Sequence, residues 1–162
     1  MKELNNRKLV LGILIVFFAM VVIWTIPANF EIVPNYSESL PYKWVLVKKG
    51  LLPSKRDQVF VFYVRDNKLL GVEKIKFIKL VGGLPGDEVT VKGEEVFVAE
   101  NLIGIAKPYS KKQQQLRATS SGIIPAHQLF AYTPHIDSFD SRYQEIGLID
   151  EKDIVGTAIL TF

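Results

Sequence analysis

Two residues in this sequence, a serine and a lysine, have types and settings that could do covalent chemistry together. Ser39 lies in the stretch Asn35-Tyr-Ser-Glu-Ser-Leu-Pro41, and Lys79 opens the run Lys-Leu-Val-Gly-Gly-Leu-Pro-Gly-Asp87. A serine hydroxyl is a weak nucleophile until a base removes its proton, and a lysine is such a base only when its amine is neutral. Lowering a lysine pKa from about 10.4 towards 7.5 costs roughly 4 kcal/mol, which burial can supply. The pair therefore predicts a serine–lysine hydrolytic centre.

The neighbours of Lys79 indicate that its side chain points inward. In a strand over residues 75–81, alternation places Lys79 on the same face as Ile75, Phe77 and Val81. An inward lysine is uncommon unless it is paired or functional. The alternatives are ordinary ones: Lys79 as a protective lysine on an edge strand, and Ser39 as a loop serine beside a proline.

An apolar run precedes the serine. Residues 9–26, LVLGILIVFFAMVVIWTI, carry no charge, and as a helix they would span roughly 27 Å, close to the thickness of a bilayer core. This pattern predicts a cytoplasmic N-terminus (1–8), a transmembrane helix (9–26) with Trp24 at the far interface, and an exported domain (30–162). The positive charges that orient such a helix are Lys2, Arg7 and Lys8.

Two other interpretations of the apolar run are weaker. A cleaved signal peptide has a shorter apolar core, roughly 7–15 residues, and a cut after Ala28 would place bulky Ile26 where a small residue is needed. A helix packed on the core of a small globular domain would have a polar side, and this run is apolar all round.

Composition excludes several classes of function. Twenty Lys and Arg against 17 Asp and Glu leave a net charge of +3, and no basic stripe with interleaved aromatics predicts a nucleic-acid partner. The sequence contains no cysteine, which excludes disulfides, thiolate catalysis and cysteine-ligated zinc. Two histidines, His127 and His135, are too few for a convincing metal cluster.

After the apolar run the sequence predicts an all-β, barrel-like domain. Short runs rich in valine, isoleucine and aromatics alternate with turn residues, and helical periodicity is missing. The polar, irregular segment 104–122 is predicted to be an exposed loop. The expected strands are Lys43–Lys49, Gln58–Arg65, Ile75–Val81, Glu88–Lys92, Glu95–Ala99, Gln128–Thr133 and Asp153–Phe162.

Three segments, in order, resemble the sequence boxes of type I signal peptidases. Asn35–Pro41 resembles the serine box, Lys79–Asp87 resembles the lysine box, and Ser138-Phe-Asp-Ser-Arg-Tyr143 resembles the third box. The similarity covers roughly residues 35–147, behind an N-terminal anchor as in that family. The most similar variant is the conjugative-transfer, TraF-type signal peptidase. The resemblance implies a signal-peptidase-like β-fold.

The resemblance also implies roles for the reacting groups. Ser39 matches the nucleophile and Lys79 the general base. Ser37 matches the residue whose hydroxyl, together with the Ser39 backbone N–H, forms the oxyanion hole. Leu40 stands where the family usually has methionine, a residue of similar volume.

The third box implies supporting residues. Ser138 matches the serine that orients the lysine, and Asp140 and Arg142 match an ion pair that braces the same corner. By themselves Asp140 and Arg142 could be a surface ion pair that contributes little stability.

The activity implied by the resemblance is that of a serine endopeptidase that cleaves leader peptides of exported proteins without a metal or organic cofactor. The TraF-type match further implies a prepilin substrate, which is hydrolysed or cyclised, and other conjugative-transfer components as partners. The protein would lie in the cytoplasmic (inner) membrane with its catalytic domain outside, in the periplasm.

Three alternatives remain open at this point. One is a general secretory signal peptidase, and another is an inactive scaffold subunit of a pilus or secretion apparatus. The third is a histidine triad of Ser39, His135 and either Asp137 or Asp140, although the sequence lacks the Gly-x-Ser-x-Gly elbow.

Overall fold

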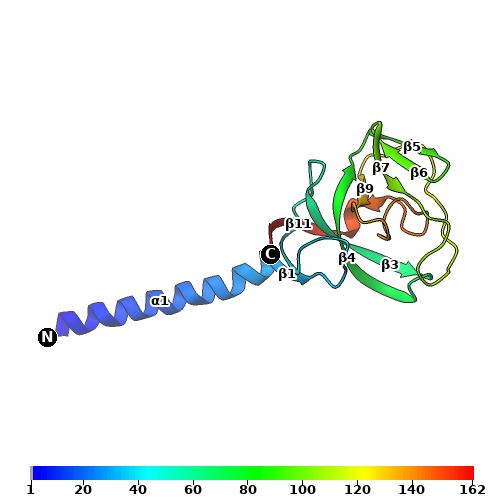
Figure 1. The fold of residues 1–162 in the computed structure, drawn as a ribbon. Coiled ribbons are helices and arrows are strands. Elements are labelled where there is room, and N and C mark those ends of the chain that lie inside the picture. The colour runs from blue at the N-terminus through cyan, green and yellow to red at the C-terminus, as the bar shows by residue number, and fades with distance from the viewer. Residues whose placement is uncertain (1) are drawn as a thin grey trace.

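The protein consists of one long N-terminal helix followed by a β-domain (Figure 1). The computed structural model describes residues 2–162, and side chains are described for all of these except 2–6, 9, 22–24, 26 and 27. Helix α1 (Lys2–Asn29) extends beyond the apolar run at both ends, projects away from the β-domain and contacts it at β1 and β2.

The predicted membrane span can be compared with α1 only in part. Within the part of the chain that the structure describes, no helix has a stretch both long and apolar enough to cross a membrane. The predicted span 9–26 includes five residues whose side chains lie outside the described set, and Lys2 lies outside it as well. Those five are Leu9, Val22, Ile23, Trp24 and Ile26. The transmembrane assignment therefore stays a prediction.

The β-domain contains two antiparallel sheets, so the all-β prediction is confirmed for residues 30–162. The seven-stranded sheet has the order β1-β2-β11-β3-β4-β9-β10, and the four-stranded sheet has the order β7-β6-β5-β8. The strands are β1 (Phe30–Pro34), β2 (Trp44–Lys49), β3 (Val59–Asn67), β4 (Val72–Gly83), β5 (Glu88–Lys92), β6 (Glu95–Val98), β7 (Asn101–Ile105), β8 (Gly122–Ile123), β9 (Gln128–Tyr132), β10 (Ile149–Asp150) and β11 (Ile154–Thr161). A 3-10 turn, η1 (Glu151–Asp153), precedes β11.

Three apolar clusters form the core. One lies between the small sheet and β9 and includes Val96, Ile124 and Phe130. The other two involve the large sheet: one is built around Phe60, Phe62 and Val81, and the other around Val45, Val47 and Val61. Successive residues of a strand point to opposite faces of the sheet, so the neighbours Phe60 and Val61 of β3 enter different clusters. Both faces of the large sheet are therefore covered at this strand.

The turn after β4 joins the two sheets, and Gly83, at the end of β4, has a packing reason. A Cβ placed on Gly83 would lie 2.5 Å from Ile124 Cδ1 and 2.7 Å from Val98 Cγ1, so only glycine allows the end of β4 to approach the small sheet this closely. Asp87 closes the turn by accepting the Leu84 N–H at 2.8 Å and a bond from Arg56 at 2.6 Å. The glycine-rich run is thus structural.

All seven predicted strands are present, with bounds that differ by a few residues at most. The prediction missed β1, β7, β8 and β10. The two-residue strands β8 and β10 carry no periodicity of their own and exist because a partner strand lies beside them. β1 ends at Pro34, and its alternation is too short to stand out beside the helix.

The prediction of an exposed loop over residues 104–122 was wrong in part. The segment begins within β7, and Ala106 and Leu116 are buried in the cluster of the small sheet. Tyr109 and Gln115 form an isolated antiparallel bridge, so the exposed residues between them lie on a hydrogen-bonded turn. Two apolar side chains among many polar ones gave no periodic signal in the sequence.

Candidate active site

Asn35 organises the turn that carries both serines. Its side-chain Nδ2 donates to the carbonyls of Leu40 at 3.2 Å and Tyr42 at 2.9 Å, and its Oδ1 accepts the backbone N–H of Ser37 at 3.1 Å. Asparagine side chains commonly bond to backbone two residues ahead in this way. Leu40 anchors the same turn, since it is buried in the cluster around Val45. The turn is therefore held from both ends.

The hydroxyls of Ser37 and Ser39 lie next to each other on this turn. Their Oγ atoms are 2.8 Å apart, and Ser37 Oγ also donates to Asn35 Oδ1 at 2.9 Å. Because a serine hydroxyl has one proton, the bond to Asn35 leaves Ser39 as the donor to Ser37. Ser39 is half-buried, while Ser37 is exposed to solvent.

Lys79 lies on β4 at the point where the pairing of this strand with β9 begins. Its strand, β4, pairs with β3 on one side, where Lys79 is opposite Phe60, and with β9 on the other side from Leu80 onward. The Lys79 side chain is only 5% exposed. The burial of Lys79 confirms the prediction of an inward side chain and rules out a solvent-exposed, protective edge-strand lysine.

The Lys79 amine is held by the third sequence box. Nζ donates to Ser138 Oγ at 2.7 Å, and it lies 5.5 Å from the centre of the Phe77 ring. Burial lowers the pKa of Lys79 from its ordinary value to about 8; the charge of Asp140 opposes this shift, and the charge of Arg142 adds to it. A substantial fraction of such an amine is neutral near pH 8.

Asp140 and Arg142 form a buried, two-pronged ion pair. Arg142 Nε and Nη2 donate to the two carboxylate oxygens, each at 2.9 Å, and the exposed fractions of the side chains are 1% for Arg142 and 0% for Asp140. Nη2 also donates to the carbonyls of His135 and Ser138. The interpretation of a surface ion pair is wrong: this pair fixes the loop that presents Ser138.

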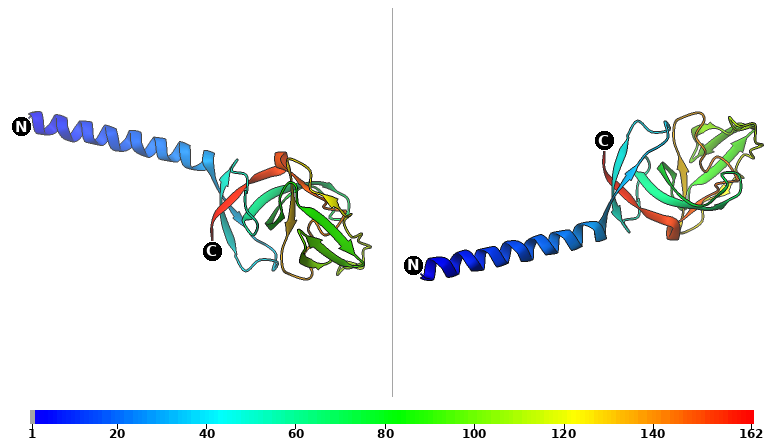
Figure 2. Two further views of the ribbon diagram at one scale, coloured as in Figure 1. Left: turned by 90° about the horizontal axis from the view of Figure 1, so that it is seen from above. Right: turned by 90° about the horizontal axis from the view of Figure 1, so that it is seen from below.

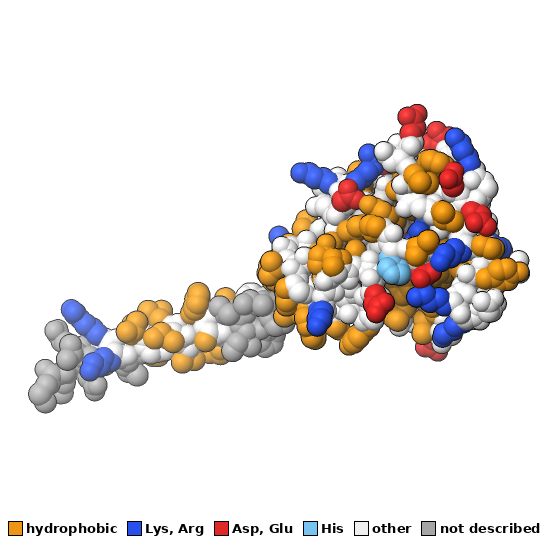
Figure 3. Space-filling model, in the orientation of Figure 1, with side chains coloured by type: hydrophobic (Ala, Val, Ile, Leu, Met, Phe, Trp, Pro, Cys, Tyr) orange, Lys and Arg blue, Asp and Glu red, His pale blue; other side chains and the backbone are white. Residues whose placement is uncertain are grey.

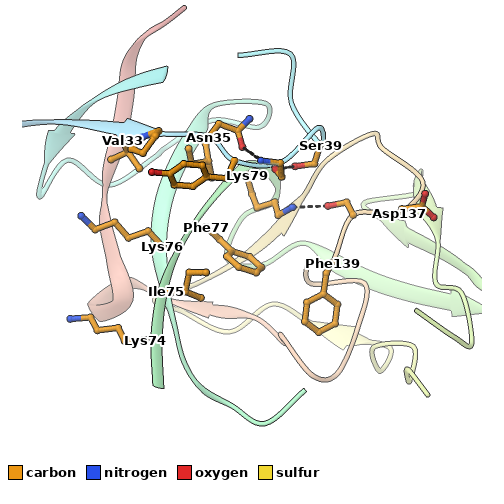
Figure 4. Close-up of a pocket in the computed structure, with 15 residues that line it drawn as sticks. Val33, Asn35, Ser39, Lys74, Ile75, Lys76, Phe77, Lys79, Asp137 and Phe139 are labelled. Carbon is orange, nitrogen blue, oxygen red and sulfur yellow. Dashed lines mark hydrogen bonds between the residues drawn. The ribbon is translucent and has the colours of Figure 1, made fainter. Parts of the chain in front are cut away.

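Ser39 and Lys79 line one cleft of about 640 Å³ (Figure 4). Its walls come from β1 with the serine turn, from residues 74–79 of β4, and from the loop 137–139. Figure 4 shows the Lys79 side chain extending from β4 toward this loop, beside the serine turn. In this structure Lys79 bonds to Ser138 and Ser39 bonds to Ser37. The structure thus brings the two predicted partners into one cleft without a direct bond between them.

The histidine triad does not form. The His135 ring accepts the backbone N–H of Asp137 at 3.1 Å. Asp140 is paired with Arg142, and Asp137 is paired with Lys107 at 2.6 Å and Lys111 at 3.1 Å. Neither carboxylate is therefore available to orient the imidazole.

Sequence reasoning missed two polar residues at the site. The role of Asn35 could have been inferred, because Asn-x-Ser before a proline is a typical side-chain-capped turn. Thr133 gave no such signal: among the described side chains its Oγ1 is buried without a hydrogen-bond partner, while its N–H donates to Asp140 at 3.2 Å. Within the described residues, no group of three or more His, Cys, Asp and Glu could hold a metal ion.

A match to a family model identifies the family of this protein. Signal peptidase I U of Bacillus subtilis (strain 168) is 29% identical over 96 residues, which make up 53% of this chain and 49% of that protein. The chain thus spans about half the length of this relative. A crystal structure of a signal peptidase I from Enterococcus faecalis V583 matches with 17% identity and a TM-score of 0.39, over 67% of this chain and 98% of that one. A family model described as signal peptidase, peptidase S26, matches residues 6–162, and the protein therefore belongs to this family.

Proposed function

We propose that this protein is a serine endopeptidase in which neutral Lys79 activates Ser39 to cleave the leader peptides of exported proteins. The observation that carries the proposal is the Lys79 amine, which is buried, bonded to Ser138 and given a pKa of about 8 in the same cleft as Ser39. A lysine whose pKa lies near the working pH can both accept and return a proton.

The proposed reaction uses Lys79 first as a base and then as an acid. Lys79 Nζ takes the Ser39 proton as Ser39 Oγ forms a bond to the scissile carbonyl carbon. The tetrahedral intermediate then collapses, the C–N bond breaks, and the Lys79 ammonium returns its proton to the departing amine. Lys79 Nζ, neutral again, then takes a proton from a water molecule that attacks the acyl carbonyl carbon; the ester C–O bond to Ser39 breaks, and Lys79 returns the proton to Ser39 Oγ.

The developing oxyanion needs donors on the serine turn. The Ser39 N–H and the Ser37 hydroxyl are the candidates, and Ser37 can serve after its hydroxyl rotates away from Asn35 Oδ1. Asn35 then has two effects: it fixes the turn, and it holds the Ser37 proton until substrate arrives. Asn35→Ala is expected to lower kcat more than it raises KM.

The substrate can bind along β4. Because β9 pairs with this strand only from Leu80 onward, the backbone edge of residues 74–78 faces the cleft. An extended peptide can add to such an edge through main-chain hydrogen bonds, while side-chain pockets select its sequence. The apolar lining from Ile75, Phe77 and Phe139 suits an apolar leader.

Membrane anchoring through α1 belongs to the same proposal. The described apolar side chains of α1 are exposed along a helix that stands clear of the β-domain (Figure 3), and their exposed fractions run from 40% to 69%. Trp44 on β2 and Leu160 on β11, two neighbouring strands of the large sheet, are also exposed. An isolated helix with such a surface is stable in lipid rather than in water.

The orientation can be tested with single cysteines, because the chain has none of its own. A cysteine at Ser54 in the β-domain should react with a membrane-impermeant maleimide in intact spheroplasts, and one at Asn5 should react only after lysis. The opposite pattern would contradict a periplasmic catalytic domain.

For the substrate, we propose a conjugative prepilin, since the serine turn has the Asn-x-Ser form of the TraF-type proteins. The full chain in detergent should process a prepilin, and Ser39→Ala and Lys79→Ala should each abolish processing. Lys49→Ala, an exposed lysine of β2, is the matched control. Mass spectrometry of the product reports the cut site, and the loss of one further water reports ring closure.

The outcomes separate the alternatives. Cleavage of secretory precursors but not of prepilin would identify a general signal peptidase. Processing that is equal in the wild type and in Ser39→Ala would contradict the enzymatic proposal and leave a scaffold role. Loss of activity in His135→Ala with retention in Lys79→Ala would restore the histidine triad.

A further inference from the structure

We propose that a second cleft, next to the one that holds Ser39, binds the substrate segment following the scissile bond and selects an acidic side chain there. This inference rests on the proposed function, because it assigns a substrate preference to the same active site. The second cleft measures about 250 Å³ and shares Asp137, Ser138 and Phe139 with the main cleft.

The shared residues make the two clefts continuous. Ser138 bonds to Lys79 on one side and lines the second cleft on the other, so a peptide that leaves the reacting centre over Ser138 and Phe139 enters the second cleft directly. Asp137 lines both clefts, and Figure 4 shows its carboxylate pointing away from Lys79. Asp137 therefore belongs chemically to the second cleft.

The charge of the second cleft fits an anion. Lys107, Lys111 and Lys112 line it, and Asp137, paired with Lys107 and Lys111, is the acidic residue among its lining. Three ammonium groups against one carboxylate leave an excess of positive charge. Leu69, Leu116 and Tyr143 supply an apolar floor. A glutamate, with an aliphatic stem and a terminal carboxylate, matches both features, and a lysine would be repelled.

The wall that carries the basic residues is held in place. Ser110 and Gln114 are joined by a backbone hydrogen bond of 2.9 Å, and the Leu116 N–H donates to the Pro108 carbonyl at 2.9 Å. The Lys107 N–H donates to the Tyr143 hydroxyl at 3.1 Å, which ties the wall to the core. Lys111 and Lys112 thus stand on an anchored turn, and the entropy lost on binding is smaller than for a free loop.

The position of this cleft indicates which part of the substrate it takes. The segment 107–116 lies at the end of the β-domain away from α1 in all three views (Figures 1 and 2), whereas β1, at the opposite wall of the main cleft, contacts α1. A leader that emerges from the membrane beside α1 enters near β1. The chain that continues toward Lys111 is then the part after the scissile bond.

The test uses the full chain in detergent and internally quenched peptides that share one cleavable sequence. Each of the first five residues after the scissile bond is made Glu, Gln or Lys in turn, and kcat/KM is measured. At one or two positions we expect the Glu peptide to exceed the Gln peptide by roughly 3- to 10-fold at low salt, with the Lys peptide below both. The ratio should shrink as salt is added.

The variants locate this preference. In the double variant Lys111→Gln/Lys112→Gln the Glu/Gln ratio should fall toward one, and Lys111→Glu/Lys112→Glu should favour the Lys peptide. The matched control is Lys48→Gln/Lys49→Gln, an adjacent exposed pair on β2 outside both clefts, which should keep the wild-type ratio. A ratio near one at all five positions, or a ratio unchanged in the Lys111/Lys112 variants, would overturn the inference.

A binding measurement separates this inference from the proposed function. Fluorescence anisotropy with the Ser39→Ala variant measures the affinity for labelled peptides that carry only the segment after the scissile bond. Each pair of peptides has Glu or Gln at the position that the cleavage assay prefers. If nothing is cleaved, pairs are made for each of the five positions. Tighter binding of a Glu peptide that is lost in the Lys111→Gln/Lys112→Gln variant supports the cleft assignment. If the wild type also cleaves nothing, the proposed function is contradicted while the cleft assignment stands. Equal affinities of all pairs would overturn the inference whatever the activity.

Discussion

Two aspartates flank Ser138, and each is paired with cations, but the surroundings of the two pairs differ. Asp140 is 0% exposed and bonded at both oxygens to a single arginine, whereas the Asp137 side chain is 24% exposed and shared between Lys107 and Lys111. The first pair supports the loop that positions Lys79, and the second lines the neighbouring cleft. Because water screens exposed charges and not buried ones, the same chemistry serves architecture in one place and recognition in the other.

Removal of one charge from the buried pair should have the largest effect. Asp140→Asn leaves the Arg142 guanidinium buried without a counter-charge, so we expect the free energy of unfolding to fall by about 3–5 kcal/mol. Urea denaturation of the full chain in detergent, followed by tryptophan fluorescence, measures this change. The variant Asp140→Leu/Arg142→Met, which removes both charges, should lose clearly less. A loss below about 1 kcal/mol in Asp140→Asn would mean that the pair behaves as an exposed one.

Removal of the Lys79 charge should have the opposite effect and should stabilise the fold. Its folded pKa of about 8 lies below the ordinary 10.5, so the unfolded chain binds the proton more tightly and the buried amine destabilises the fold at neutral pH. Lys79→Met should therefore raise the free energy of unfolding by about 3 kcal/mol at pH 7, while the proposed mechanism predicts loss of activity.

The sign of this effect can be followed with pH. The advantage of Lys79→Met should be complete below pH 8 and should shrink as pH rises from 8 to 10.5, because the amine is then neutral in both states. Lys111→Met, at an exposed position, should change stability little at any pH. If Lys79→Met gives no gain at pH 7, the amine is not desolvated.

The pH dependence of cleavage provides a smaller effect, roughly 25-fold. In the proposed mechanism neutral Lys79 is the active form, so kcat/KM should rise between pH 6.5 and 8.5 with an apparent pKa near 8 and level off above about pH 9. Asp137→Asn should leave this midpoint in place. A midpoint near 6.5 would indicate that a histidine, not Lys79, is the base.

Disruption of the exposed pair should cost little. Asp137→Asn is expected to lower the free energy of unfolding far less than Asp140→Asn does, since Lys107 and Lys111 remain solvated without their partner. The measurement is the same urea titration. A loss as large as that of Asp140→Asn would remove the distinction between the two pairs.

The smallest effect concerns Thr133, next to the buried pair. Its hydroxyl is buried and unpaired among the described residues, so Thr133→Val, which preserves the shape, should be neutral or slightly stabilising. Thermal unfolding monitored by circular dichroism checks this prediction. Marked destabilisation would show that the hydroxyl is bonded, for instance through water.

Local patterns in the sequence predicted much of the fold. The alternation of β3 and β4 identified both strands and the inward face of Lys79, because side chains of a strand alternate irrespective of what covers them. The short strands β8 and β10 could not be found this way, since they depend on hydrogen bonds from distant partners. Leu116 was missed for a related reason: a single apolar residue in a polar segment has no period.

The sequence by itself determined the identities and order of the site residues, and through Asn35 it encoded the turn that presents Ser39. Only the tertiary structure decided how those residues behave. The fold buries the Lys79 side chain, which desolvates its amine. The fold buries the ion pair of Asp140 and Arg142, and it brings Lys107 into an ion pair with Asp137, thirty residues away in the chain. A pKa and the strength of an ion pair depend on the surrounding dielectric, and that environment is built by residues far apart in sequence.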